Sequence, residues 1–170
     1  MKKSIFLLLG CLITMASCQK SGIYAFRGDY SFKTSGEVSI QRESPEPTSL
    51  IPATFTVALS NDIGQMEIHT LDKKEDKVLV IINYADDEVI VTEGVCDGQE
   101  IKLEEFSRNV TNFSVYSYLS ASCIVKIKAT GHIYDGKTIV FDEVYDGTAT
   151  IANYTYNIRG NKITTIATRN

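Results

Sequence analysis

The chain has 170 residues, of which 44% are hydrophobic and 22% are charged, and its formal net charge is −4. This length and composition predict one globular domain that folds without a metal or a disulfide framework, unlike a disordered chain. The acidic balance and the lack of a Lys/Arg cluster argue against nucleic acid as a partner, because that binding depends on neutralising phosphates.

The first 17 residues have the order of features found in a bacterial export signal. Two lysines at residues 2–3 precede an apolar run at residues 4–15, and two small residues then lead to Cys18. The run is too short to cross a bilayer as a helix, so it predicts a signal peptide at residues 1–17. Without this leader the chain keeps 15 basic and 21 acidic side chains, a net charge of −6.

The residues before Cys18 resemble the lipobox of bacterial lipoproteins. That resemblance implies cleavage before Cys18, fatty acyl chains such as palmitate on the new terminus, and a membrane as partner through this anchor. Gln19 stands where Asp would signal inner-membrane retention, which implies an outer-membrane lipoprotein facing the periplasm. The alternative is plain secretion with a free Cys18. Residues 18–27 are expected to link the anchor to a single domain at residues 28–170.

Alternation of apolar and polar residues dominates the chain after this linker. From Tyr30 to Ile40 most even positions are apolar and the odd ones polar, which predicts a long half-buried strand with a bend or a bulge at Gly36. Further strands are expected at residues 53–59, 65–71, 77–84, 88–96, 100–104, 122–129, 131–134, 137–141, 148–158 and 162–168.

The turn residues predict how these strands are joined. The Asp-Gly pairs at 97–98, 135–136 and 146–147, and the Gly-Asn pair at 160–161, suit two-residue hairpin turns with positive φ. About ten strands with no convincing helix predict an all-β fold, an antiparallel up-and-down β-barrel of about 8–10 strands, with a β-sandwich as the alternative. Closure is favoured because it removes edge strands.

One sequence pattern occurs twice. Residues 97–105 and 135–143 both read Asp-Gly-x-x-Ile-x-apolar-acid-Glu, which predicts a repeated hairpin unit within one barrel. Residues 105–121 are ambiguous, and are either another strand pair or a loop over the barrel mouth.

Two segments resemble a known family. Gly28-Asp29-Tyr30 resembles the lipocalin G-x-W signature with Tyr in place of Trp, and residues 131–137 resemble the carboxy-terminal part of the calycin-like (lipocalin-like) bacterial lipoproteins. The similarity covers most of the predicted domain and implies an up-and-down barrel that holds a small hydrophobic ligand. In lipocalins the signature Trp packs under an Arg from the last strands, which implies a structural pair of Tyr30 and Arg159 next to Gly28.

Tyrosines in the second half are candidates for lining a ligand cavity, because Tyr combines an apolar ring with a polar tip. Tyr154 and Tyr156 share one strand face. The alternative is ordinary filling of an eight-stranded barrel, whose interior is just wide enough for side chains. The candidate ligand-binding residues are Tyr116, Tyr118, Tyr134, Tyr154 and Tyr156.

The residues that carry catalytic or metal chemistry are few. His69 and His132 are the only histidines, and neither has metal-ligand spacing or a nucleophile elbow nearby, so we expect no enzyme, no metal and no cofactor. Cys96 and Cys123 remain after export, and the sequence leaves open whether they form a disulfide or stay as two buried thiols.

These observations leave two functional hypotheses. The first is an envelope lipoprotein that binds a small hydrophobic ligand inside its barrel, and it predicts an interior cavity lined by Tyr and aliphatic side chains. The alternative is a structural or protein-interaction component of an envelope complex, with a filled barrel and an exposed aromatic patch for which residues 113–119 are the candidate.

Overall fold

The computed structural model describes residues 22–44, 52–59, 62–74, 76–116 and 119–170, and for residues 111–116 and 119–121 it gives the backbone alone. The predicted signal peptide and Cys18 lie outside the described residues. Within the described residues, no helix has both the length and the apolar character needed to cross a membrane.

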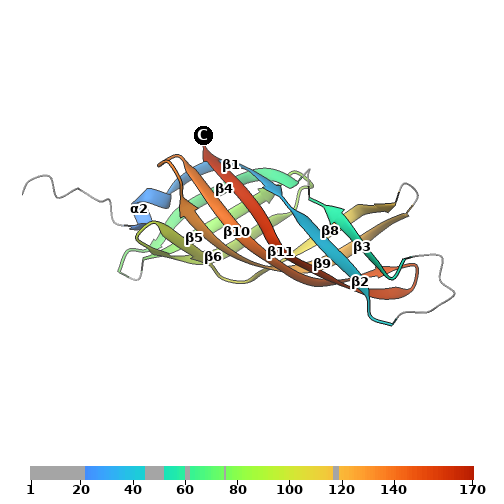
Figure 1. Cartoon of the computed structure of the whole chain (residues 1–170). Helices are drawn as coiled ribbons and strands as arrows, with labels where there is room; N and C mark the ends of the chain where they lie inside the picture. The colour runs from blue at the N-terminus through green and yellow to red at the C-terminus, as the bar shows by residue number, and fades with distance from the viewer. Residues whose placement is uncertain (1–21, 45–51, 60–61, 75, 117–118) are drawn as a thin grey trace, which may run out of the picture.

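The described part of the chain forms one short helix and eleven strands (Figure 1). In chain order they are α2 Gly22–Phe26, β1 Gly28–Ser35, β2 Glu37–Arg42, β3 Thr54–Ala58, β4 Asp62–Asp72, β5 Lys77–Tyr84, β6 Val89–Asp97, β7 Glu100–Leu103, β8 Phe106–Tyr116, β9 Leu119–Ile133, β10 Thr138–Ile151 and β11 Tyr154–Arg169.

Eight of these eleven strands close into an antiparallel barrel, as the sequence predicts. Neighbours follow the order β1-β4-β5-β6-β7-β9-β10-β11, and pairing of β11 with β1 closes the ring. At the end opposite α2, β8 extends the wall along β9, while β2 and β3 extend it along β11 (Figure 1). The ambiguous segment after residue 105 is therefore a strand pair, β8 with β9.

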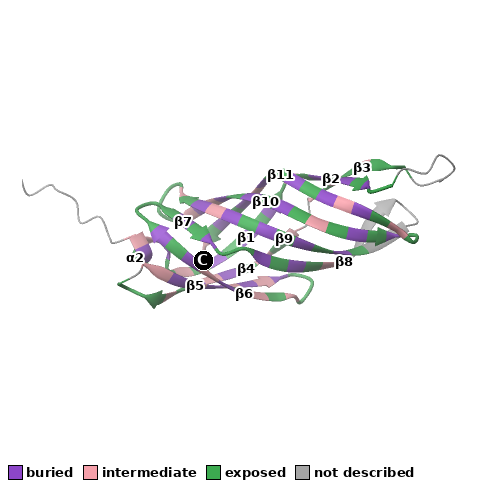
Figure 2. Cartoon of the chain, turned by 90° about the horizontal axis from the view of Figure 1, so that it is seen from below, coloured by how far each residue is buried: buried purple, intermediate pink, exposed green. Residues whose placement is uncertain are grey.

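Alternate residues of most strands point into the barrel, which gives the banding of buried and exposed positions in Figure 2. The inward side chains form one continuous apolar core. Its largest fully buried members include Tyr30, Phe26, Phe141 and Tyr156. Burial of these rings supplies the main driving force for closure.

The predicted bend at Gly36 is confirmed. This residue separates β1 from β2 and has a φ of 141°, a conformation that side chains on L-residues rarely adopt. An added Cβ would lie 2.8 Å from the carbonyl oxygen of Lys162. Because Gly36 allows this bend, β1 and β2 follow each other directly in the chain and both pair with β11.

Two of the four predicted turns are wrong. Asp146-Gly147 lies inside β10, where an added Cβ on Gly147 would be 2.3 Å from the Ile124 carbonyl oxygen, so a small residue serves close strand packing there. Gly160-Asn161 lies inside β11 at a bulge opposite Val144. The β10–β11 turn instead falls at Ala152 and Asn153, with φ of 48° and 69°, and so divides the strand predicted at residues 148–158.

The repeated pattern is confirmed as a hairpin in both copies. Gly98 joins β6 to β7 and Gly136 joins β9 to β10, with φ of 59° and 75°. Both β7 and β10 pair with β9, so the two copies flank the same strand. The copies differ at their last acid, because Glu105 is exposed whereas Glu143 is buried.

The expected linker at residues 18–27 is wrong from Gly22 onward. Helix α2 packs Ile23 and Phe26 into the core at one end of the barrel. Both side chains are almost fully buried, and burying apolar side chains of this size stabilises the contact between the helix and the barrel. The described domain therefore starts with this helix and not at Gly28.

Candidate functional site

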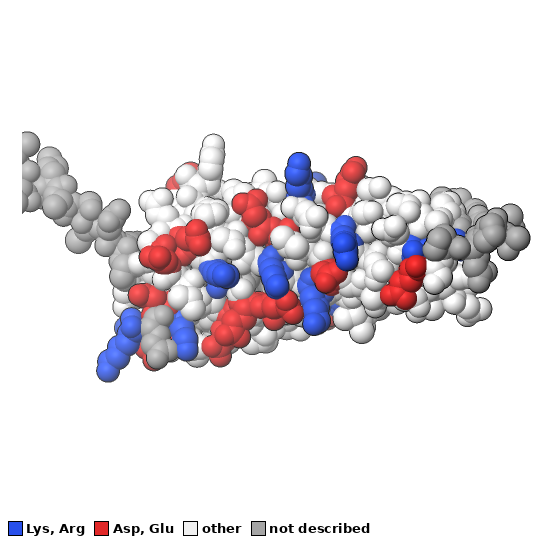
Figure 3. Space-filling model, turned by 60° about the horizontal axis from the view of Figure 1, so that its bottom comes forward, with Lys and Arg blue, Asp and Glu red and all other residues white. Residues whose placement is uncertain are grey.

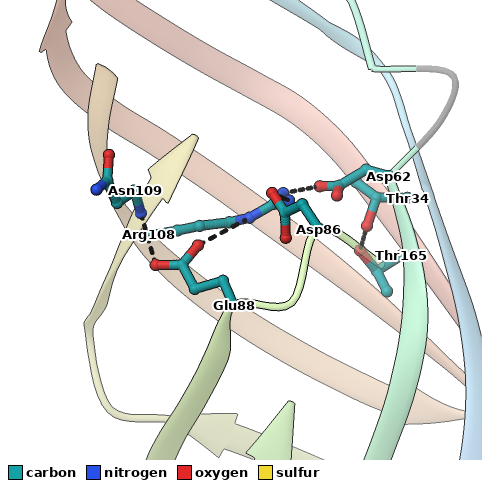
Figure 4. Close-up of polar contacts among 7 residues, drawn as sticks. All are labelled: Thr34, Asp62, Asp86, Glu88, Arg108, Asn109 and Thr165. Atoms are coloured by element: carbon teal, nitrogen blue, oxygen red, sulfur yellow. Dashed lines mark hydrogen bonds and ion pairs between the residues drawn. The ribbon is translucent and has the colours of Figure 1, made fainter. Parts of the chain in front are cut away.

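A belt of polar side chains crosses the otherwise apolar barrel interior. Its centre is Arg108 of β8, which is buried and lies where the β5–β6 hairpin ends (Figure 4). Arg108 sits on the inward face between Phe106 and Val110, and β8 pairs with β9 here. A guanidinium in this position must find anionic partners, because burying it unpaired is costly.

Three carboxylates from other parts of the chain meet this guanidinium. Arg108 Nη1 donates a hydrogen bond to Asp62 at the start of β4, and Arg108 Nη2 donates to Asp86 at 3.2 Å. Glu88 Oε2 lies 3.6 Å from Arg108 Nε. Glu88 Oε1 also accepts a hydrogen bond from the backbone N–H of Asn109 at 2.8 Å. These contacts tie the β5–β6 turn and the start of β4 to β8.

The environment shifts the acid–base behaviour of this cluster. Burial raises the pKa of Asp62, and the adjacent Arg108 opposes that rise by stabilising the carboxylate. The guanidinium carbon of Arg108 lies 3.7 Å from the ring centroid of Tyr84, which is a cation–π contact. Burial also raises the pKa of the Tyr84 phenol, so this ring stays neutral.

Glu143 of β10 is a second buried acid of the belt. Burial raises its pKa from 4.5 to about 7, and hydrogen bonds from Thr165 and Tyr145 partly oppose that rise. Thr165 also shares a 2.6 Å hydrogen bond with Thr34, the register partner of Asp62 (Figure 4). The hydroxyl groups thus link Glu143, through β11 and β1, to the residue opposite Asp62.

The belt offers a structural role more readily than a chemical one. Its acids are occupied by Arg108 or by hydroxyl groups. Within the part of the chain that the structure describes, no group of three His, Cys, Asp or Glu side chains is placed to hold a metal ion. His69 and His132 lie outside the belt on the exposed wall, 3.2 Å from Glu67 and 3.8 Å from Glu100. This arrangement holds strands together.

The implied pair of Tyr30 and Arg159 is wrong, because Arg169 takes the place of Arg159. Arg169 Nη2 donates a 2.6 Å hydrogen bond to Tyr30 Oη, and its guanidinium carbon is 5.2 Å from the ring centroid. Arg159 is exposed on the outer wall. The bulge in β11 shifts the inward positions from even to odd numbers, which turns Arg159 out and Arg169 toward the end of the barrel.

Arg169 and Tyr30 together hold helix α2. Tyr30 Oη donates to the Phe26 carbonyl oxygen at 2.6 Å, and Arg169 Nη2 donates to those of Ala25 and Arg27 at 2.6 and 3.1 Å. Gly28 has a φ of 153°, and an added Cβ would lie 3.0 Å from Arg169 Nε. The structural candidates Gly28 and Tyr30 therefore do lie at one contact.

Replacement of Tyr30 by Phe tests this contact. The variant loses two hydrogen bonds in a buried place, so we expect the free energy of unfolding in urea to fall by about 1–3 kcal/mol. Tyr134→Phe is the control, because Tyr134 is 80% exposed and a surface change of this kind alters stability by less than about 0.5 kcal/mol. Equal stabilities of the two variants would contradict a locking role for Tyr30.

Of the tyrosines predicted to line a cavity, Tyr154 and Tyr156 lie together, and both rings contact the Arg42 guanidinium. Tyr134 is 80% exposed in the β9–β10 connection, so its assignment to a cavity is wrong. Tyr156 is fully buried, and its hydroxyl accepts from Arg42 Nε at 3.2 Å and donates to the Pro52 carbonyl oxygen at 3.3 Å. The guanidinium carbon of Arg42 lies 4.5 Å from the ring centroid of Tyr154. The side chain of Tyr116 and the whole of Tyr118 lie outside the described residues.

Cys96 and Cys123 are free, buried thiols, so a Cys96–Cys123 disulfide is not formed. They sit on β6 and β9, and burial raises the pKa of each thiol to about 11. We expect neither Cys96 nor Cys123 to react with a thiol reagent at pH 8 until denaturant is added, and both to react afterwards. Release of no thiol on denaturation would indicate a disulfide after all.

The outer wall carries most of the charged residues. On the face drawn in Figure 3, acidic and basic side chains are interspersed rather than gathered by sign. Lys126 and Lys128 of β9, for example, both lie near Glu105, at 3.7 and 3.5 Å. Such exposed pairs add little to stability but leave no strong field of one sign.

Closure and strand order define the class of protein as a small antiparallel β-barrel. No family model and no curated protein matches the chain. Among solved structures the chain is similar to a redesigned β-barrel, at 12% sequence identity and a TM-score of 0.40, over 88% of this chain and 95% of that one. A likeness this distant carries no functional argument, so the function has to be argued from the residues.

Proposed function

We propose that this protein is a lipid-anchored cell-envelope protein that works as a non-enzymatic binding module through the outer wall of its barrel. The observation that carries the proposal is the single core formed by the inward side chains of the described residues. Inward side chains from every barrel strand contribute to one core, and the polar belt crosses it. The candidate tyrosines that do point inward, Tyr154 and Tyr156, are used to pack Arg42.

This reading favours the interaction hypothesis over the carriage of a small hydrophobic molecule. The outer wall has exposed apolar side chains on β6, which a barrel that functions only through its interior does not need. The anchor is supported by the leader and the lipobox-like residues before Cys18. The calycin-like resemblance is supported by the contact of Tyr30 with Arg169, and it remains part of the proposal.

Native mass spectrometry of the protein purified from its own host membranes tests the proposal. We expect a mass that includes acyl chains on Cys18 and lacks both residues 1–17 and any further small molecule. Cys18→Ser, in the same host, is expected to lose the acyl mass and to leave the membrane fraction. A small hydrophobic molecule retained in stoichiometric amount would overturn the filled-barrel proposal, and an unmodified Cys18 would overturn the anchor.

A further inference from the structure

The end of the barrel that carries α2 brings this helix together with three turns of the chain. The start of α2 lies against the β6–β7 turn, where an added Cβ on Gly22 would be 2.9 Å from the Gly98 carbonyl oxygen. The β9–β10 turn lies beside the β6–β7 turn, because Ile133 N donates to the Gln99 carbonyl oxygen at 3.1 Å. Strand β4 also contacts α2. We call α2 and residues 71–74, 97–100 and 133–138 the α2 rim (Figure 1).

Three large apolar side chains of the α2 rim are exposed, and each comes from a different element. Tyr24 of α2 is 40% exposed, Leu71 near the end of β4 is 47% exposed, and Tyr134 in the β9–β10 turn is 80% exposed. In the ring of strands, β4 is separated from β10 by β1 and β11, and from β9 by β5, β6 and β7. The three side chains are therefore spread around the rim, where a broad surface can contact all of them at once.

The residue types on the α2 rim suit the boundary between lipid and water. Lys73 Nζ lies 5.7 Å from the ring centroid of Tyr24, and Lys137 follows Tyr134 in the same turn. At a membrane surface, a tyrosine ring packs at the level of the headgroups with its hydroxyl in water. A lysine lays its apolar stem on such a surface and keeps its charge in water.

The charges of the α2 rim are balanced in sign. The exposed cations are Lys73, Lys74 and Lys137, and the exposed acids are Asp72, Asp97, Glu100 and Asp135. Two of these acids hold their own turns, because Asp72 and Asp135 each accept a hydrogen bond from a backbone N–H at 2.7 Å. A rim of this kind has no cationic cluster that would select anionic lipids, so zwitterionic headgroups match it.

The proposed anchor identifies the surface that the α2 rim meets. Gly22, the first residue of α2, follows Cys18 after only three residues, so acyl chains on Cys18 would keep the rim close to a bilayer. A tether this short gives the bilayer a high effective concentration at the rim. Contacts of three side chains, which are weak on their own, then suffice to orient the barrel.

We infer that the α2 rim contacts zwitterionic phospholipid headgroups, with Tyr24, Leu71 and Tyr134 at the boundary between headgroups and acyl chains. This inference rests on the proposed lipid anchor and adds a second membrane contact, made by the folded domain itself. A protein partner fits this end less well, because protein interfaces need their apolar anchors gathered in one well-packed centre. The rim instead has its apolar side chains apart, with charged side chains between them.

The chain contains no Trp, so a single introduced Trp reports on its own position. Tyr134→Trp places the reporter on the rim, and Ile124→Trp is the control on the outer wall. Ile124 is 59% exposed on β9, nine residues before Ile133 and so about 30 Å from the rim along the strand. Each variant is purified from its host membranes as the acylated mature protein. It is then reconstituted on vesicles of phosphatidylethanolamine and phosphatidylcholine in equal parts.

Phosphatidylcholine that carries bromine on its acyl chains next to the headgroup quenches nearby Trp and reads out the contact. We expect it to lower the emission of Tyr134→Trp at least twofold and that of Ile124→Trp less than 1.2-fold. Tyr24→Trp should be quenched like Tyr134→Trp, because both positions belong to the same rim. Replacing part of the phosphatidylethanolamine by phosphatidylglycerol should change the quenching less than 1.2-fold, since the rim charges are balanced.

The outcomes separate the rim contact from the anchor. Protein that stays on the vesicles without quenching of Tyr134→Trp would overturn the rim contact and leave the anchor standing. Equal quenching of Ile124→Trp would overturn it as well, because the barrel would then lie on its side. Quenching that requires phosphatidylglycerol would overturn the assignment to zwitterionic headgroups. Protein that leaves the vesicles, or that carries no acyl chains on Cys18, would overturn the anchor and the inference with it.

Discussion

Replacement of Arg108 by Met is expected to lower the free energy of unfolding by about 3–5 kcal/mol at pH 7, because it leaves a buried carboxylate without its counter-charge. Asp62 is the partner most affected, since its side chain is only 10% exposed. Asp86 and Glu88 are more open to water and contribute less. Urea unfolding followed by circular dichroism measures the change.

A matched pair of variants shows whether the lost charge, and not the lost packing, causes this effect. Arg159→Met changes an exposed arginine on the outer wall and should alter stability by less than about 0.5 kcal/mol. Adding Asp62→Asn to Arg108→Met should restore part of the loss, because the unpaired carboxylate is removed with its partner. A loss below about 1 kcal/mol in Arg108→Met would mean that the cluster does not stabilise the barrel.

Replacement of Glu143 by Gln is expected to stabilise the protein at pH 8 by about 3 kcal/mol and to change little at pH 4.5. Burial raises the pKa of Glu143 from 4.5 to about 7 in the folded state. The folded state therefore keeps a proton that the unfolded chain releases, so this group stabilises the fold below about pH 4.5 and loses that contribution as the pH rises through about 7. Gln keeps the neutral, hydrogen-bonding form throughout.

Unfolding free energies measured from pH 4.5 to 8.5 test this dependence. The difference between wild type and Glu143→Gln should grow with pH and level off above about 8. Glu105→Gln is the control, because Glu105 occupies the same place in the repeated sequence pattern but is exposed. A pH-independent difference for Glu143→Gln would show that its carboxyl has an ordinary pKa.

Much of the barrel could be predicted from the sequence, because alternation and Asp-Gly turns are local signals. The strand at residues 77–84 was predicted with its observed bounds, and the turns at Gly98 and Gly136 are where the pattern puts them. The two wrong turns occur where a glycine has another use. Gly147 provides room for a neighbouring strand, and Gly160 belongs to a bulge, so neither makes a turn.

The polar belt could not be predicted from local sequence patterns, although one of its residues was visible in them. Arg108 stands between Phe106 and Val110 in an alternating segment, so a cation on an apolar face was visible in a region taken as ambiguous. Its partners come from the ends of β4 and β5, far away in the chain, and only the barrel closure brings them near. The exchange of Arg159 for Arg169 likewise depends on a bulge that reverses which positions face inward.

The fastening of helix α2 by the last strand has a consequence for orientation. Asn170 donates its N–H to the Asp29 carbonyl oxygen, so the final residue lies beside the start of β1 at the helix-bearing pole. Only three residues, 19–21, separate Cys18 from Gly22, and these four chain steps limit the proposed acylated tether to about 14 Å. In a barrel anchored through Cys18, the end that carries α2 would therefore face the lipid. The opposite end, which includes Val89 of β6, would point away from the bilayer.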